Sequence, residues 1–115
     1  MSETKFTPGP WIPAGPSFGE PKMRFANSVI PDRDDDEYPD DICEMPFPYY
    51  DEEQEANAHL IAAAPDMYEE LECARDLFRF YQSHHEFKGG TEKAIRNKEI
   101  ADRIDRLLAK ARGDA

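Results

Sequence analysis

Carboxylates are the most concentrated reactive groups of this sequence. Twelve of its 25 acidic side chains lie in the 24 residues from Asp32 to Glu55, where Arg33 is the one cation. They are Asp32, Asp34, Asp35, Asp36, Glu37, Asp40, Asp41, Glu44, Asp51, Glu52, Glu53 and Glu55. An array of carboxylates can occupy a basic groove that otherwise holds a phosphate backbone. This acidic segment, residues 32–55, therefore predicts either a surface that binds a basic partner or a solvated loop, which is what charge runs usually form.

The same segment resembles a calcium-binding loop in part. Asp32, Asp34 and Asp36 have the spacing of the first three carboxylates of an EF-hand loop. Glu37 stands where that loop needs glycine for its sharp turn, and Cys43 stands in place of the bidentate glutamate. The pattern favours weak cation association over a specific metal site.

The histidines and cysteines add little chemistry. Glu55 and His59 have the i, i+4 spacing of two metal ligands on a helix, but no second ligand pair accompanies them. His84 and His85 close a predicted helix, where positive charge suits the helix dipole. No nucleophile elbow or phosphate-binding loop is present, and Cys43 and Cys73 are expected to be free thiols. We expect no cofactor, no metal and no enzymatic activity; a small metal-dependent hydrolase that uses the acidic segment and His59 is the alternative.

Aromatic residues adjoin the acidic run. Phe47, Tyr49 and Tyr50 alternate with Pro46 and Pro48 in an extended stretch. Such side chains either pack against helices or serve as interface anchors beside a charged rim. The predicted partner-binding residues are therefore Asp32, Asp34, Asp35, Asp36, Glu37, Asp40, Asp41, Glu44, Phe47, Tyr49, Tyr50, Asp51 and Glu52.

The charge of the whole chain sharpens this prediction. The 115 residues carry a formal net charge of −11, and the acidic segment alone accounts for all of it. A protein with this balance does not bind nucleic acid through a general basic surface. No apolar run approaches the ~18 residues of a membrane span. We expect a single domain over residues 1–115, with no direct nucleic-acid partner and no membrane partner.

The first half must position the acidic segment with strands and turns. Nine of the ten prolines lie at or before residue 48, which disfavours a long helix there. Strands are predicted at Met23–Ile30 and Asp41–Phe47, and the segment around Trp11 is a third candidate. Alternation in the first of these is imperfect, because apolar residues fall on both of its faces.

The second half, residues 51–115, is predicted to be helical. A first short helix follows the acidic residues 51–55 and has Leu60 and Ile61 as its expected anchors, and Pro65 then ends or kinks it. A second helix has Met67, Leu71, Ala74, Phe78 and Tyr81 as its apolar stripe, which Leu77 and Phe80 widen.

A third helix follows Gly89–Gly90. Thr91 is its expected cap and Gly113 lies past its end. Its apolar stripe is Ile100, Ile104, Leu107, Leu108 and Ala111. The fold class predicted is α+β: a small antiparallel sheet of two or three strands packed on a C-terminal helical hairpin, with a preceding short helix.

Two motifs carry a family resemblance. Thr7-Pro8-Gly9-Pro10-Trp11 and the run from Ala56 to Asp66, ANAHLIAAAPD, resemble the "TPGPW" start and "ANAxLIAAAP" helix of a group of small phage and prophage proteins. The resemblance is good around Trp11 and over residues 53–72, and loose at the C-terminus. Residues 32–41 depart from it, since typical members have a shorter and less acidic connection. It implies a phage origin and the host bacterial cytoplasm, and it implies no catalytic residue.

These observations give two non-enzymatic hypotheses. The first is a phage-encoded protein that inhibits or modulates a host protein with a basic surface, such as a nucleic-acid-binding defence complex of the kind that anti-CRISPR proteins or DNA mimics target. The second is a structural module that forms a homodimer through its helices, with the acidic loop incidental.

Overall fold

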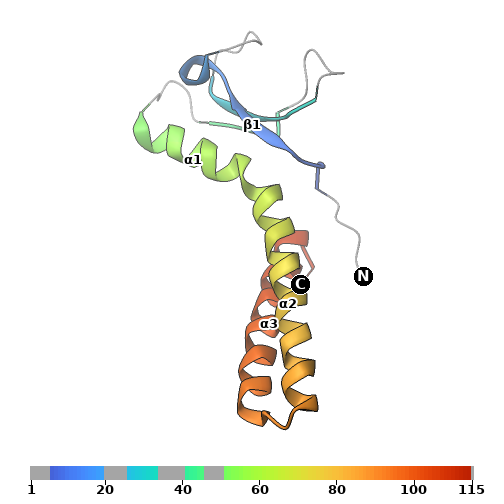
Figure 1. Ribbon diagram of the computed structural model, residues 1–115. Helices are drawn as coiled ribbons and strands as arrows, with labels where there is room; N and C mark the ends of the chain where they lie inside the picture. Colours follow the sequence, from blue (N-terminus) through green and yellow to red (C-terminus); the bar gives the residue numbers. More distant parts are fainter. Residues whose placement is uncertain (1–5, 20–25, 34–40, 46–50, 115) are drawn as a thin grey trace. The chain divides into compact units, whose positions relative to one another are not determined.

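The computed structural model describes residues 6–19, 26–33, 41–45 and 51–114, and it shows the predicted α+β class. The elements follow in the order β1 (Trp11–Ala14), a 3-10 turn (Pro16–Phe18), β2 (Ser28–Pro31), β3 (Cys43–Glu44), α1 (Glu52–Ala62), α2 (Ala64–Phe87) and α3 (Thr91–Arg112) (Figure 1). The described residues form two compact units. The sheet unit comprises residues 7–66, and the hairpin unit comprises residues 67–114 with Phe6.

The sheet unit contains a three-stranded antiparallel sheet in the order β1-β2-β3. Trp11 pairs with Pro31 and Ala14 with Ser28 across the first pair of strands, while Val29 pairs with Cys43 across the second. All four residues of the central strand β2 are buried, including Ser28. Buried and exposed side chains therefore do not alternate along this strand, as they would in a strand with one face in solvent. The predicted starts and ends at residues 23–25 and 46–47 lie outside the described residues.

The helix that covers this sheet is α1, which contacts β1 and β2. Its buried positions are Gln54, Ala58 and Ala62, spaced four apart along one face. Ala58 and Ala62 form a core cluster with Val29 and Met45, against which Trp11 and Ile61 pack. Leu60 is 61% exposed, so its predicted role as an anchor is wrong. The small side chains set the buried face of α1, and Leu60 lies off it.

The two motifs of the family resemblance meet in this unit. Trp11 from the first motif packs on the cluster that contains Ala58 and Ala62 from the second. A Cβ on Gly9 would lie 2.8 Å from Cβ of Pro65, so that position has no room for a side chain. The Trp11 indole also donates a hydrogen bond to the Thr7 carbonyl at 3.1 Å. Residues of the two motifs therefore pack against each other in one core.

The hairpin unit joins α2 and α3 through the turn at Gly89, whose φ of +80° is in the left-handed region. The buried residues of α3 are Ala94, Ala101 and Leu108, each seven positions after the last. Gly113 ends α3 in a left-handed conformation, as predicted. The predicted cap was misplaced by one residue, because Gly90 is the N-cap and Thr91 is already the first helical residue.

The inner face of α2 differs from its predicted stripe. Met67 and Tyr81 are 48% and 42% exposed, whereas Arg75 and Arg79 are half-buried. These arginines form ion pairs with α3 and share the inner side of α2 with Leu71, Ala74 and Phe78, which are partly buried. Leu77 and Phe80, expected to widen the inner stripe, are 50% and 63% exposed.

Candidate interaction surfaces

Five predicted partner-binding residues lie in the described part of the acidic segment. Asp32 follows β2, and its backbone N–H donates to the Pro10 carbonyl at 2.9 Å. Asp41 precedes β3, Glu44 ends it, and Asp51 and Glu52 begin α1. All five are exposed. The others, Asp34, Asp35, Asp36, Glu37, Asp40, Phe47, Tyr49 and Tyr50, lie outside the described residues.

Asp51 has a structural role within this segment. It is the N-cap of α1, and its Oδ1 accepts a hydrogen bond from the backbone N–H of Gln54 at 2.8 Å. Glu52 and Glu53 occupy the first turn that follows, where carboxylates complement the positive end of the helix dipole. The local sequence Asp51-Glu52-Glu53 therefore folds into a helix start that presents two exposed carboxylates.

A buried polar network fixes α1 against β2. Asn27, which is fully buried, donates through Nδ2 to Oε1 of Gln54 and to Oγ of Ser17, both at 2.8 Å. Its Oδ1 accepts from the backbone N–H of Ser17 at 3.0 Å. A buried amide with all these partners holds its neighbours in one arrangement. The network sets the position of the helix start that carries Glu52 and Glu53, and sequence reasoning missed it.

Cys43 lies beside the acidic residues of the sheet unit. Burial raises the pKa of its thiol, the nearby Asp41 carboxylate raises it further, and a hydrogen bond with the Val29 backbone opposes both. The thiolate is therefore disfavoured, and Cys43 is not an activated nucleophile. Cys43 and Cys73 are both free thiols.

A cluster of ion pairs joins the two helices of the hairpin unit. Arg79 contacts Asp102 at 2.7 Å and Asp105 at 2.6 Å, and Arg75 contacts Asp105 at 3.0 Å. Lys98 and Arg79 lower the pKa of Asp102 through hydrogen bonds. Partial burial pushes the pKa of Asp105 upward, but hydrogen bonds from Arg79 and Arg75 outweigh it, so that pKa also lies below its ordinary value.

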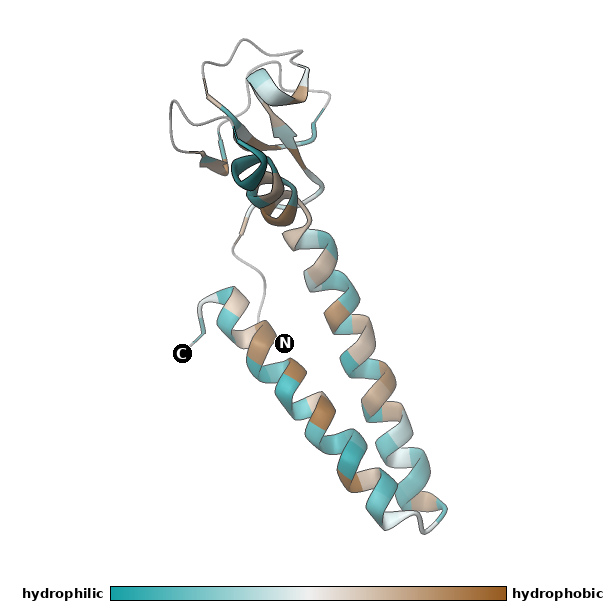
Figure 2. Ribbon diagram, turned by 90° about the vertical axis from the view of Figure 1, so that its left-hand side faces the viewer, coloured by the Kyte–Doolittle hydropathy of each residue, from teal (hydrophilic) through white to brown (hydrophobic). Residues whose placement is uncertain are grey.

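A second surface follows the side of α2 that turns away from these ion pairs. The outer face of α2 is defined here as Cys73, Leu77, Phe80, His84 and Phe87. All five are exposed, Phe87 by 86%. Figure 2 shows hydrophobic positions recurring between hydrophilic ones along both helices of the hairpin. Large apolar side chains that gather on one exposed face are a mark of an interaction site.

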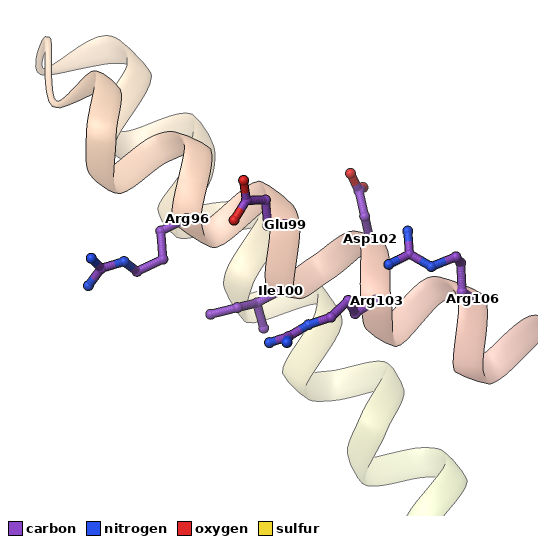
Figure 3. Close-up of a pocket in the computed structure, with 6 residues that line it drawn as sticks. All are labelled: Arg96, Glu99, Ile100, Asp102, Arg103 and Arg106. Atoms are coloured by element: carbon purple, nitrogen blue, oxygen red, sulfur yellow. The ribbon is translucent and has the colours of Figure 1, made fainter.

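A third surface is a hollow along α3. Arg96, Glu99, Ile100, Asp102, Arg103 and Arg106 line it, and all six come from this one helix (Figure 3). Asp102 is paired with Arg79 and Lys98, whereas Arg96, Arg103 and Arg106 have no ion pair among the described residues. These three guanidinium groups form a cationic strip on a chain whose net charge is negative, and no spacing singled them out in the sequence.

The described residues contain neither a membrane-spanning helix nor a cluster of metal ligands. None of the described helices is long and apolar enough to cross a membrane. No group of three or more potential metal ligands gathers among them, so Glu55 and His59 have no further ligand there. The ring of His59 instead makes an edge-to-face contact with Phe18 at 5.3 Å between centroids.

The class of protein follows from a comparison with protein families. The chain is a phage protein: one family model matches it over residues 1–115. That model describes Salmonella phage P22 protein Y8K6, and the chain belongs to this family. No curated protein and no solved structure matches the chain. The family match supports the phage origin that the two sequence motifs implied.

Proposed function

We propose that this phage protein is a non-enzymatic binding protein that acts in the host cytoplasm. Its acidic segment binds a basic surface of a host protein and so inhibits or modulates that protein. A complex that holds DNA or RNA in a basic channel is the class of target that fits best, because carboxylates can then compete with phosphates for the same cations.

The observation that carries the proposal is the separation of charge. The acidic segment holds the whole net charge of −11, and the remaining residues sum to zero. Asp32, Glu44 and Glu52 are exposed, and none of them forms an ion pair within the described residues. In the hairpin unit, by contrast, ten acidic residues are balanced by ten basic ones, so its exposed carboxylates lie among cations. Carboxylates that the protein leaves unpaired remain available to a basic partner.

The experiment is affinity capture from host lysate with the full chain as bait. Exposed charges are screened over about 8–10 Å near physiological ionic strength, so a partner held by the acidic segment is released as salt rises. We expect capture at about 0.05 M salt and release at about 0.5 M salt. Added duplex DNA should displace the same partner if its basic surface is a nucleic-acid site.

Two outcomes would contradict the proposal. One is a partner retained equally at both salt concentrations, because apolar contacts rather than charges would then hold it. The other is a partner that still binds fully to a triple variant, Glu44→Gln, Glu52→Gln and Glu53→Gln. These three side chains are exposed, so the variant is expected to fold.

A further inference from the structure

The outer face of α2 has the spacing of a coiled-coil seam. Its residues Cys73, Leu77, Phe80, His84 and Phe87 recur at intervals of four, three, four and three. Leu77 is 50% exposed and Phe80 63%, so the seam is not covered within the described residues. The contacts with α3 come from another side of the helix, through Arg75 and Arg79. Within the described residues, the hairpin therefore leaves this seam, with Leu77, Phe80 and Phe87 as its large apolar side chains, without a partner helix.

Phe80, in the middle of the seam, makes two aromatic contacts. The rings of Phe80 and His84 stack with centroids 6.4 Å apart, and Phe80 meets Tyr81 edge-to-face at 5.7 Å. Side chains that are fixed before binding lose less conformational entropy when a partner covers them. The seam is thus suited to a helix with a similar apolar row.

We propose that a second copy of this chain covers the seam, with the two α2 helices antiparallel about a two-fold axis. The two helices cross midway between Leu77 and Phe80. Each of these two residues then contacts both Leu77 and Phe80 of the other copy. It also sets Cys73 of one copy level with His84 of the other. An isologous contact of this kind uses the same patch on both subunits, as closed dimers do.

Charge complementarity supports both the occupant and the direction. Glu70 and Lys88 lie on the same flank of the seam, one near each end of it, and both are exposed without an ion pair among the described residues. Lys88 continues the last turn of α2, since its backbone N–H donates to the His84 carbonyl at 3.0 Å. In the antiparallel pair, Glu70 of each copy lies beside Lys88 of the other. In a parallel two-fold pair, the flank that holds Glu70 and Lys88 lies on opposite sides of the seam in the two copies, so these two residues do not meet.

The first test is the mass of the full chain in solution, measured by sedimentation at about 100 µM protein. We expect twice the 13.2 kDa of one chain. Leu77→Glu should give the monomer, because it buries a charge at the centre of the seam. Ile95→Glu is the matched control: Ile95 is an apolar residue of α3 with 53% exposure, outside the seam, and this variant should remain dimeric. A monomeric wild type, or equal dissociation by both variants, would overturn the proposal.

The second test fixes the direction and does not depend on Leu77. Glu70→Lys and Lys88→Glu should each weaken the dimer about five- to tenfold, because each replaces two symmetric attractions with repulsions. The double variant should regain most of the wild-type affinity. If the double variant is instead weaker than either single variant, the antiparallel arrangement is wrong.

Discussion

The two units of this protein distribute their charges differently. In the sheet unit, apolar contacts around Val29 and a buried amide network around Asn27 hold the elements together, and the carboxylates face solvent. In the hairpin unit, ion pairs of Arg75 and Arg79 with α3 accompany a buried row that includes Ala101 and Leu108. Large apolar residues of α2, such as Phe80, face solvent there. The comparison teaches that each unit leaves exposed the kind of group that its own packing does not use.

The largest expected effect is at Gly15 of the sheet unit. Its φ is +120°, and a Cβ there would lie 2.6 Å from the Ala26 carbonyl oxygen. Gly15→Ala should therefore lower the free energy of unfolding by about 3 kcal/mol, measured by denaturant titration of Trp11 fluorescence. Gly19→Ala is the control, because its φ is +64° but nothing lies within 4 Å. That variant should lose only about 1 kcal/mol, and equal losses would show that the close contact is unimportant.

The next effect concerns the buried amide. Asn27→Ala leaves Oε1 of Gln54 and the backbone N–H of Ser17 without their partner. We expect a loss of about 2–3 kcal/mol in the free energy of unfolding. Asn57→Ala removes an exposed amide on α1 and should change it by less than about 0.5 kcal/mol. Should Asn27→Ala be as mild as Asn57→Ala, apolar packing alone would hold the sheet unit.

A smaller effect is expected in the hairpin unit. Asp105→Asn removes the carboxylate that Arg75 and Arg79 share, and these side chains are partly exposed to solvent. The free energy of unfolding should fall by about 1 kcal/mol, measured through the helical circular dichroism signal during denaturation. Glu99→Gln, on the exposed side of α3, is the control and should be neutral.

The pH dependence of the hairpin unit follows from the same ion pairs. The pKa values of Asp102 and Asp105 are lowered from an ordinary value of 3.8. A lowered pKa in the folded state means that the stabilisation is complete above the ordinary value and is lost as pH falls through the lowered one. Helical stability should therefore decline below about pH 3.8, and it should decline less steeply in Asp105→Asn. An identical acid response in both proteins would contradict the role given to these pairs.

Much of the fold could be predicted from local patterns. The prolines disfavour a long helix in the first half. Asp51 and the glutamates after it indicate the start of α1, and Gly89–Gly90 indicates the turn between the long helices. These signals act over a few residues, so a single sequence contains them. The family motifs also indicated correctly that the chain is a phage protein.

The remaining features depend on contacts between distant residues. Nothing in the sequence pairs Asn27 with Gln54, because a hydrogen bond across 27 positions leaves no periodic pattern. The inner face of α2 was predicted only in part, because apolar periodicity indicates Leu71 and Phe78 but not Arg75 and Arg79, which reach that face through ion pairs. Leu77 and Phe80, which the same reasoning placed inside the hairpin, are therefore exposed and belong to the seam.

The most direct test of the central claim compares two matched neutralisations in binding to the captured host protein. The first is the triple variant at Glu44, Glu52 and Glu53 of the sheet unit. The second, Glu72→Gln, Glu92→Gln and Glu99→Gln, removes the same charge from the hairpin unit, again from side chains without an ion pair among the described residues.

Each interfacial charge contact contributes on the order of 0.5–1 kcal/mol, so the first variant should bind at least about tenfold more weakly, with a smaller dependence of Kd on salt. The second variant should bind within about twofold of the wild type. Equal weakening by both variants would contradict the account, because net charge rather than the acidic segment would then determine binding.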